Sequence, residues 1–182
     1  MSLYNTGVLK FGRFRLSSGK ISNYYIDVRI IPTSPSLYSK VITAYLSTVK
    51  RFGSGNFDCV VGVATAGLLF SIPVSLKLGV PMSYVRTNTK GHGTKRKLEG
   101  RIEKGSRAIV LDDIATTGGS ILKAVEEVSS LQGEVVAAFV FVDREEGAEE
   151  NLLKAGVRLY SCFKVSEIFE TLHRKGLFKK EI

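Results

Sequence analysis

The feature that most constrains the fold of this chain is the alternation of apolar runs with helical patterns from about residue 58 onward. Five runs predict strands: Cys59–Val63, Met82–Arg86, Ala108–Leu111, Val135–Val142 and Val157–Phe163. They lack strict polar–apolar alternation, which is typical of strands buried on both faces. Helical patterns are predicted at Leu37–Arg51, Leu68–Leu78, Ile121–Leu131, Glu150–Ala155 and Ser166–Lys175. This order predicts an α/β fold with a central, mostly parallel sheet flanked by helices.

Two stretches break the alternation. Phe11–Arg29 has no helical period and predicts a compact N-terminal flap. Thr87–Lys104 is long, polar and contains glycines, although it stands where a crossover helix is expected. Long connections inside compact domains are commonly functional lids or disordered segments. No repeat or linker divides the 182 residues, so we expect a single domain over 1–182.

The charge of the chain is uneven. Its 26 Lys and Arg outnumber its 17 Asp and Glu, and residues 1–104 hold 16 of the former and 4 of the latter. A basic half indicates an anionic partner, which composition leaves open as nucleic acid, a membrane surface or a polyphosphate. The sequence shows no apolar run of bilayer-spanning length and no signal peptide, which predicts a cytoplasmic protein. Cys59 and Cys162 lie in apolar runs and are expected as buried thiols.

The stretch Val110–Val125, VLDDIATTGGSILKAV, passes from an apolar strand to an apolar-periodic helix. Between them stand Asp112 and Asp113, and then a turn of threonines, glycines and Ser120. Glycines let backbone N–H groups approach a ligand, and a helix N-terminus favours an anion. The turn lacks the lysine of a Walker A loop and the spacing of a dinucleotide fingerprint. It therefore predicts a phosphate-binding turn of another kind.

The two carboxylates would repel a phosphate at close range. They are consistent with a ligand whose other part offers sugar hydroxyls or a metal. Because neighbours on a strand point to opposite faces, we expect one of the two aspartates to contact the ligand and the other to organise the site. The alternative is an exposed turn with a helix cap, which two acids at the end of an apolar strand make costly.

The residues VLDDIATTGGS resemble the signature of the type I phosphoribosyltransferases. The resemblance implies a turn that binds the 5-phosphate of phosphoribosyl pyrophosphate (PRPP) and acids that bind its ribose hydroxyls. It also implies an N-terminal hood, about residues 1–36, and a mobile catalytic loop, 87–104. The PRPP contacts implied for this segment are Asp112, Asp113, Ile114, Ala115, Thr116, Thr117, Gly118, Gly119 and Ser120.

Four further stretches resemble the orotate-specific members of that family: Phe14–Arg29 (FRLSSGKISNYYIDVR), Val60–Leu78, Tyr84–Gly100 (YVRTNTKGHGTKRKLEG) and Val142–Gly147 (VDREEG). The resemblance implies transfer of the phosphoribosyl group from PRPP to orotate, giving orotidine 5′-monophosphate and pyrophosphate in pyrimidine synthesis. A carboxylate-bearing base calls for an arginine, and the resemblance implies Arg144, Thr116, Tyr24 and Tyr25 as orotate contacts. Ordinary core packing is the alternative for either tyrosine.

In the loop, Arg86, Lys90 and His92 match the family's pyrophosphate-contacting positions, and with Asp112 and Asp113 they are the predicted catalytic residues. Cations aimed at a departing pyrophosphate stabilise charge that grows in the transition state. The resemblance implies Mg²⁺ as cofactor, held mainly through PRPP, with a water-mediated contact to Asp112 or Asp113 left open. It also implies a homodimer whose loop reaches the partner's site. The run 95–97 is expected as a solvated basic stretch.

The sequence departs from this pattern at Thr87, Ala66 and Ser17, where some members carry lysine. Two alternative functions are compatible with the fold: transfer to another base, and a PRPP-sensing regulator that binds nucleic acid. Arg144 and the N-terminal stretch argue against the first. The lack of a helix-turn-helix before residue 58 and the presence of Lys90 and His92 argue against the second. We therefore expect neither a nucleic-acid nor a membrane partner.

Overall fold

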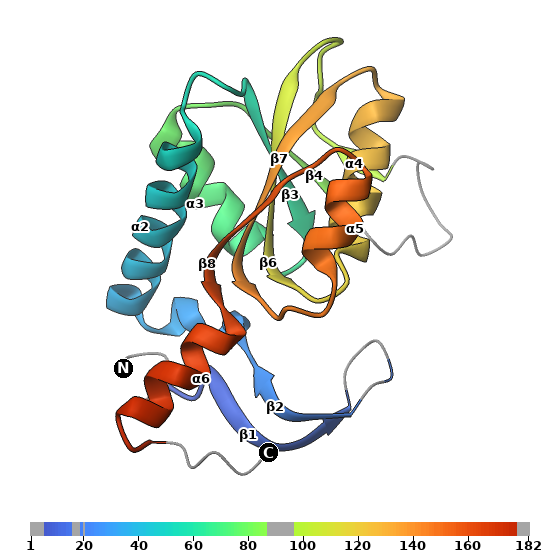
Figure 1. Ribbon diagram of the computed structural model, residues 1–182. Helices are drawn as coiled ribbons and strands as arrows, with labels where there is room; N and C mark the ends of the chain where they lie inside the picture. Colours follow the sequence, from blue (N-terminus) through green and yellow to red (C-terminus); the bar gives the residue numbers. More distant parts are fainter. Residues whose placement is uncertain (1–5, 16–18, 20, 87–96, 178–182) are drawn as a thin grey trace.

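The computed structural model describes residues 6–15, 19, 21–86 and 97–177 of the chain. Its elements are β1 (Leu9–Arg15), β2 (Ile21–Ile26), the 3-10 helix η1 (Val28–Thr33), α2 (Pro35–Phe52), β3 (Cys59–Ala64), α3 (Leu68–Leu78), β4 (Met82–Arg86), β5 (Leu98–Glu99), β6 (Arg107–Ala115), α4 (Gly119–Ser130), β7 (Glu134–Asp143), α5 (Ala148–Lys154), β8 (Leu159–Lys164) and α6 (Val165–Arg174). A central sheet and a separate N-terminal hairpin make up its two parts (Figure 1).

The central sheet has the strand order β5-β4-β3-β6-β7-β8, and all of its pairs are parallel except β4 with β5. The predicted α/β class with a mostly parallel sheet is therefore confirmed. β6 lies in the middle, between β3 and β7, and runs further than the sequence pattern predicts, since it ends at Ala115 rather than Leu111. Asp112 and Asp113 consequently lie on the strand itself, and Asp112 is paired in register with Val140.

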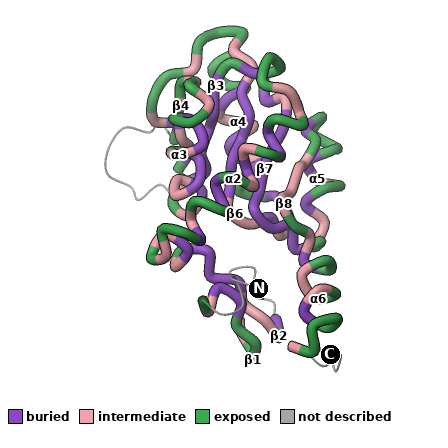
Figure 2. Tube along the Cα trace, turned by 90° about the vertical axis from the view of Figure 1, so that its left-hand side faces the viewer, coloured by how far each residue is buried: buried purple, intermediate pink, exposed green. Residues whose placement is uncertain are grey.

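Helices cover both faces of the sheet, with α2 and α3 on one face and α4 and α5 on the other (Figure 1). On the first face Tyr45 stacks on Phe70 and Phe141, with ring centroids 5.5 and 6.2 Å apart. On the other face Ala124 and Val128 of α4 pack with the strands. The central strands β3, β6 and β7 are buried along most of their length (Figure 2). Burial on two sides explains why their apolar runs do not alternate.

The hood is the antiparallel hairpin of β1 and β2, which lies below the sheet in Figure 1 beside α6. Phe169 of α6 contacts the hairpin twice, with its ring centroid 6.1 Å from that of Phe11 and 4.9 Å from that of Tyr24. The second contact is edge to face, a favourable geometry for two aromatic rings. The predicted flap is thus a hairpin that the last helix of the chain holds in place.

The connection expected over Thr87–Lys104 contains a short strand near its end. Arg86 N–H donates to the carbonyl of Lys97 at 2.8 Å, and the buried Leu98 of β5 pairs with Val85 of β4. Two residues are too few to show a strand period, so the sequence does not predict β5. The rest of the predicted loop, residues 87–96 with Lys90 and His92, lies outside the described residues. In the ranges that are described, no helix has the length and apolarity needed to cross a bilayer.

Candidate functional site

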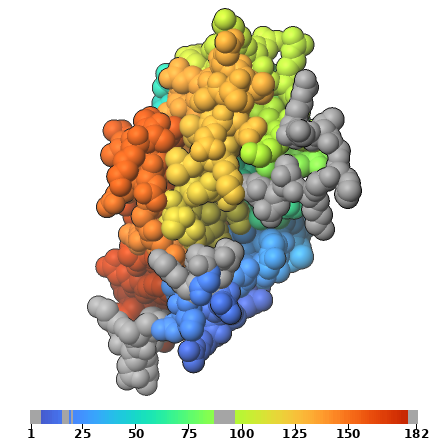
Figure 3. Space-filling view, turned by 90° about the vertical axis from the view of Figure 1, so that its right-hand side faces the viewer, coloured from blue at the N-terminus to red at the C-terminus, as the bar shows by residue number. Residues whose placement is uncertain are grey.

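A cleft of about 410 Å³ lies between the carboxyl ends of the central strands and the hood. In Figure 3 the surface of α4 is seen next to that of the hood, in yellow and blue. In open α/β sheets, ligands bind at this end of the strands. The residues that line the cleft are Arg15, Tyr25, Ile26, Asp27, Val28, Arg29, Val63, Ala64, Thr65, Ala66, Asp112, Asp113, Ile114, Thr116, Ser120 and Arg144.

Asp112 is fixed on several sides at the end of β6. Tyr45 of α2 donates its hydroxyl to the carbonyl of Asp112 at 2.6 Å, and an Asp112 carboxylate oxygen accepts the backbone N–H of Asp113 at 2.9 Å. α3 begins directly against this carboxylate, since a Cβ at Gly67 would lie 2.9 Å from the same oxygen. Only a glycine allows this approach. Asp112 is 5% exposed, whereas Asp113 is half-buried, as expected of neighbours on opposite faces of a strand.

Burial raises the pKa of the Asp112 carboxyl well above its ordinary value, and the neighbouring charge of Asp113 raises it further. Two like charges at adjacent positions in a poorly solvated site disfavour ionisation of both. Folding therefore places a carboxylate where its charge is unfavourable until a donor or a cation arrives. Strain of this electrostatic kind is a mark of functional sites, because a packed core would avoid it.

The turn after β6 encloses a second, small cavity of about 30 Å³. It is lined by Asp112, Ile114, Ala115, Thr116, Gly118, Gly119, Ser120 and Ile121. Gly118, with a φ of 80°, stands in the left-handed region that favours glycine and precedes the first residue of α4. The amino end of this 12-residue helix therefore faces a cavity lined by small residues and hydroxyls, which suits an anion. Thr117 is not part of this lining, and its carbonyl accepts the Asn151 side-chain N–H at 3.0 Å.

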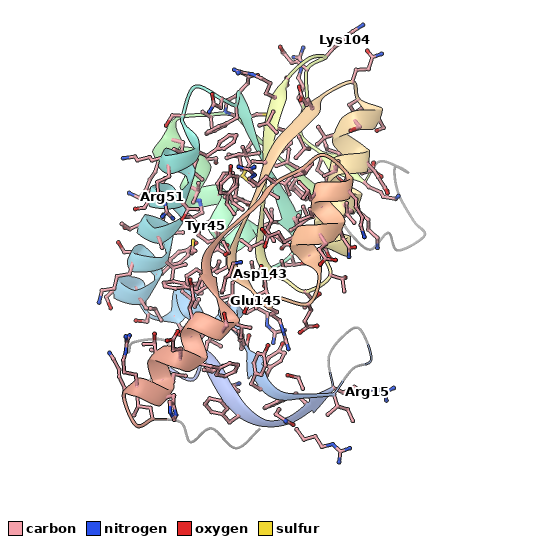
Figure 4. All side chains as sticks on the ribbon, viewed as in Figure 1. Arg15, Tyr45, Arg51, Lys104, Asp143 and Glu145 are labelled. Carbon is pink, nitrogen blue, oxygen red and sulfur yellow. The ribbon has the colours of Figure 1, made fainter. Side chains whose placement is uncertain are left out.

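Arg144 follows β7 and closes the other side of the cleft. It is 6% exposed, and its backbone N–H donates to the carbonyl of Ala115 at 2.9 Å, which ties it to the end of β6. Its Nη2 donates to Ser22 Oγ at 3.2 Å. Its Nε lies 2.8 Å from Glu146 Oε1, in an ion pair rather than an aligned hydrogen bond. Figure 4 shows the flanking residues Asp143 and Glu145 at the end of β7 nearest the hood.

The two predicted tyrosines take different positions. Tyr25 lines the cleft, and its hydroxyl accepts a hydrogen bond from Arg29 Nη2 at 3.2 Å. Tyr24 is not part of the lining: its ring lies under the guanidinium of Arg144, 4.5 Å from ring centroid to Cζ, and against Phe169. The structure places Tyr25 in the cleft lining, whereas the contact of Tyr24 with the base stays a prediction. Adjacent residues of β2 face opposite ways, so the two side chains have different surroundings.

The sequence interpretation missed an ion pair at the edge of the hood. Arg29 binds Asp27 through Nε at 2.8 Å and Nη2 at 3.2 Å, and both residues line the cleft. These hydrogen bonds lower the pKa of Asp27, which is itself buried. Arg15 of the lining was not singled out either, whereas the segment 63–66 lies within the stretch Val60–Leu78, which resembles the family's pyrophosphate-side loop. The spacing of Asp27 and Arg29 carries no periodic signal, because the chain changes there from β2 to η1.

Among the predicted pyrophosphate contacts, the structure describes Arg86 only. It ends β4, in register with Ala64 of β3, and its guanidinium pairs with Glu99 at 3.2 Å. Lys90 and His92 lie outside the described residues, as do Thr87 and Ser17. Ala66 lines the cleft without offering a charge there.

The described residues contain no group of three or more His, Cys, Asp or Glu arranged to hold a metal. The cleft does offer the carboxylates of Asp112 and Asp113 beside the turn after β6. Mg²⁺ prefers one or two carboxylates together with ligand phosphates and waters. The donor set therefore fits a magnesium ion that a phosphorylated ligand brings with it.

Comparisons with known proteins agree with the fold. Residues 31–164 match the phosphoribosyl transferase domain family. The chain is 48% identical to an orotate phosphoribosyltransferase of Sulfolobus acidocaldarius, over 97% of this chain and 87% of that protein. It is 45% identical to one of Staphylothermus marinus, over 100% and 87%. A crystal structure of orotate phosphoribosyltransferase from Aeropyrum pernix superimposes with a TM-score of 0.87 at 41% identity, covering 95% of this chain and 97% of that one.

Proposed function

The chain belongs to the orotate phosphoribosyltransferase family of the phosphoribosyltransferases, and we propose that the cleft between the sheet and the hood holds both substrates of that reaction. The enzyme transfers the phosphoribosyl group of PRPP to orotate in pyrimidine nucleotide synthesis. Orotidine 5′-monophosphate and pyrophosphate are the products. Each part of the reaction can be assigned to residues of this chain.

One observation carries the assignment: a single cleft joins two carboxylates and an anion-binding turn to a buried arginine. The turn Thr116–Ser120 suits the 5-phosphate, through backbone N–H groups and hydroxyls without added charge. Asp112 and Asp113 accept hydrogen bonds from the ribose hydroxyls. Arg144 then faces the carboxylate of orotate with donors of matching charge. Tyr25 forms the apolar wall beside the base.

The chemistry requires the C1–O bond to pyrophosphate to break while a bond forms from C1 to the ring nitrogen of orotate, which gives up its proton. Positive charge grows on the sugar, beside the carboxylates of Asp112 and Asp113, and negative charge grows on the leaving group. We assign stabilisation of the leaving group to Arg86, Lys90 and His92. When bound, Mg²⁺ neutralises part of the charge on the pyrophosphate. The hood excludes water, which competes for C1.

We further propose that the enzyme is a homodimer with shared sites. Arg86 ends β4, the neighbour of the edge strand β5, at the start of the connection between these two strands. A connection of that length can cross a two-fold interface, and two-fold dimers are the commonest oligomers. PRPP and orotate are anions that do not enter a bilayer freely, so we place the enzyme in the cytoplasm. These substrates also account for the basic character of the chain without a nucleic acid partner.

The loss of orotate absorbance tests the function. Purified protein is mixed with PRPP, Mg²⁺ and one base at a time: orotate, uracil, adenine, guanine or nicotinate. We expect turnover of orotate, and loss of that turnover when either PRPP or Mg²⁺ is left out. Turnover of another base in place of orotate would overturn the proposal. A DNA gel shift that weakens with salt, in a protein without turnover, would favour a regulator instead.

A further inference from the structure

Arg144 is an unusually buried cation, and its surroundings are more elaborate than neutralisation requires. Its side chain is 5% exposed, and that of its ionic partner Glu146 is 21% exposed. A buried charge needs a partner, and one carboxylate would supply it. Two further groups from the hood also contact the same guanidinium, Ser22 through its hydroxyl and Tyr24 through the face of its ring. Three contacts from two segments fix both the position and the plane of the group.

The hydroxyl of Ser22 is itself oriented. It donates to the carbonyl of Tyr24 at 2.8 Å, so its proton is already used and its lone pairs face Arg144 Nη2 at 3.2 Å. A hydroxyl has one proton and two acceptor positions, which makes this division possible. Ser22 is buried in the folded chain. Its geometry therefore gives Arg144 an acceptor of fixed direction at little entropic cost.

Glu146 engages the guanidinium at Nε, on the same edge as the Nη2 that contacts Ser22. A guanidinium carries five N–H donors in a planar fork, so contacts at Nε and Nη2 do not exhaust it. Tyr24 covers one face and is in turn held edge-on by Phe169. The three contacts together fix the direction of the remaining N–H donors. Arg144 is part of the cleft lining, so these donors are available to a ligand there.

We propose that Glu146, Ser22 and Tyr24 are positioning residues that fix the guanidinium of Arg144 for a planar carboxylate, and that through it they set the preference for a pyrimidine bearing that carboxylate. The inference rests on the proposed role of Arg144 as the orotate contact. It decides between two opposite effects of Glu146. As a negative charge Glu146 repels an anionic base, whereas as the ionic partner of Arg144 Nε it holds the arginine in place. The contact at 2.8 Å and the shared burial favour the second.

Replacement of Glu146 separates the two effects. Glu146→Ala removes both the oxygen beside Nε and the charge, while Glu146→Gln keeps an oxygen of similar reach and removes the charge. If positioning dominates, Glu146→Ala raises the KM for orotate about tenfold, the loss of one charge-assisted contact. Glu146→Gln then stays within about threefold of the parent, and the KM for PRPP stays unchanged in both. If both variants lower the orotate KM, charge repulsion dominates and the proposal is wrong.

Specificity gives a readout that a purely structural role would not move. The ratio of kcat/KM for orotate to that for uracil, which lacks the carboxylate, is expected to fall in Glu146→Ala and, less, in Ser22→Ala. Thermal denaturation reports whether each variant folds. Ser22→Ala removes only a hydroxyl and keeps the test available should Glu146→Ala fail to fold. Glu150→Ala on the exposed face of α5 is the matched control and should leave every parameter unchanged.

A double variant distinguishes failure of this inference from failure of the function. In an Arg144→Ala background, Glu146→Ala should add nothing, because a positioning residue acts only through the group it positions. Additive losses in the double variant would overturn the inference. If the parent enzyme does not turn over orotate at all, the proposed function fails first. If the parent is active and Arg144→Ala impairs orotate binding while Glu146→Ala does not, only the inference fails.

Discussion

The two sides of the cleft are built in opposite ways. The sugar-phosphate side is one continuous stretch, Asp112–Ser120, which the end of β6 and the start of α4 hold in place. The base side is assembled from β2, the turn after β7 and α6, and its central contact joins Ser22 to Arg144 over 122 residues of sequence. The residues of the first side all belong to one strand–turn–helix unit. The second exists only when the hood is docked on the sheet.

The difference extends to energetics. On the sugar side, burial of Asp112 next to Asp113 leaves a carboxylate in an unfavourable state until a ligand arrives. On the base side, two arginines of the free protein already have carboxylate partners, Arg144 with Glu146 and Arg29 with Asp27. We infer that the sugar side lowers the stability of the free protein and regains it when the ligand binds. The base side instead holds its arginine in a fixed position before the ligand binds. Substitutions on each side test that division.

The largest effect is expected for the sugar side. Replacing both aspartates, Asp112→Asn with Asp113→Asn, removes two charge-assisted contacts to the ribose, each worth about 1.5–3 kcal/mol. Together they predict a fall in kcat/KM of about 10³-fold, measured by orotate consumption. Thermal denaturation without ligand provides the control, because the variant should be at least as stable as the parent. A decrease in kcat/KM of less than tenfold would show that these carboxylates do not contact the ribose.

A substitution on the base side should change the KM of one substrate only. Arg144→Ala is expected to raise the KM for orotate about 10- to 100-fold, since it removes a charge-assisted contact to a carboxylate. The KM for PRPP should change little, because Asp112 and the turn after β6 are left intact. Steady-state kinetics with each substrate varied in turn make the measurement. Equal changes in both KM values would mean that the two sides do not separate as described.

Mixing inactive variants sharpens the comparison further, because it asks whether the sugar side is completed by a second chain. One variant carries Lys90→Ala with His92→Ala, the other Asp112→Asn with Asp113→Asn. After subunit exchange, half of the dimers are mixed, and each has one site with an intact loop and an intact carboxylate pair. Activity should recover to about a quarter of the parent value by random pairing. Continued inactivity despite proven exchange would place the loop in its own subunit's site.

The smallest effect concerns stability. Because the pKa of Asp112 is raised in the folded chain, its contribution to stability is fully present below its ordinary value of about 3.8 and is lost as pH rises through the raised value. The Asp112→Asn variant has no carboxyl group to ionise at this position, so it does not lose this contribution to stability. The single variant should therefore unfold at a temperature roughly 2–4 °C higher than the parent near neutral pH, and the gap should close toward pH 4. A difference in unfolding temperature that does not depend on pH would show that ionisation of Asp112 does not destabilise the folded chain.

Much of the fold was predictable because its signals are local. The five buried strands and the main helices follow from apolar periodicity, and the phosphate-binding turn follows from a stretch of adjacent residues. β5 was missed because two residues show no period, and β1 and β2 because a mostly exposed hairpin carries little apolar signal. The end of β6 was predicted too early, since charged residues usually mark the end of a buried strand.

The base side shows what sequence reasoning could not provide. Tyr24 and Tyr25 are indistinguishable by type, and only the register of β2 decides which faces the cleft. In the sequence Glu146 is one of several acidic residues after β7. Only the coordinates show its contact with Nε of Arg144, on which its proposed role rests. These relations depend on distances between segments far apart in the chain. A motif that folds on itself can be recognised in a sequence, whereas a site assembled across the fold requires the coordinates.

The packing of Phe169 against the hood has a consequence for the newly made chain. Synthesis proceeds from the N-terminus, and domains fold as their residues emerge. The hairpin that carries Tyr24 is made early, but its aromatic support on α6 is made after every strand of the described central sheet. A nascent chain that has already formed its phosphate-binding turn therefore still lacks a rigid arginine for the base. Such a chain would hold the sugar donor before it can choose the acceptor, and discrimination among bases would be acquired later than binding of the sugar donor.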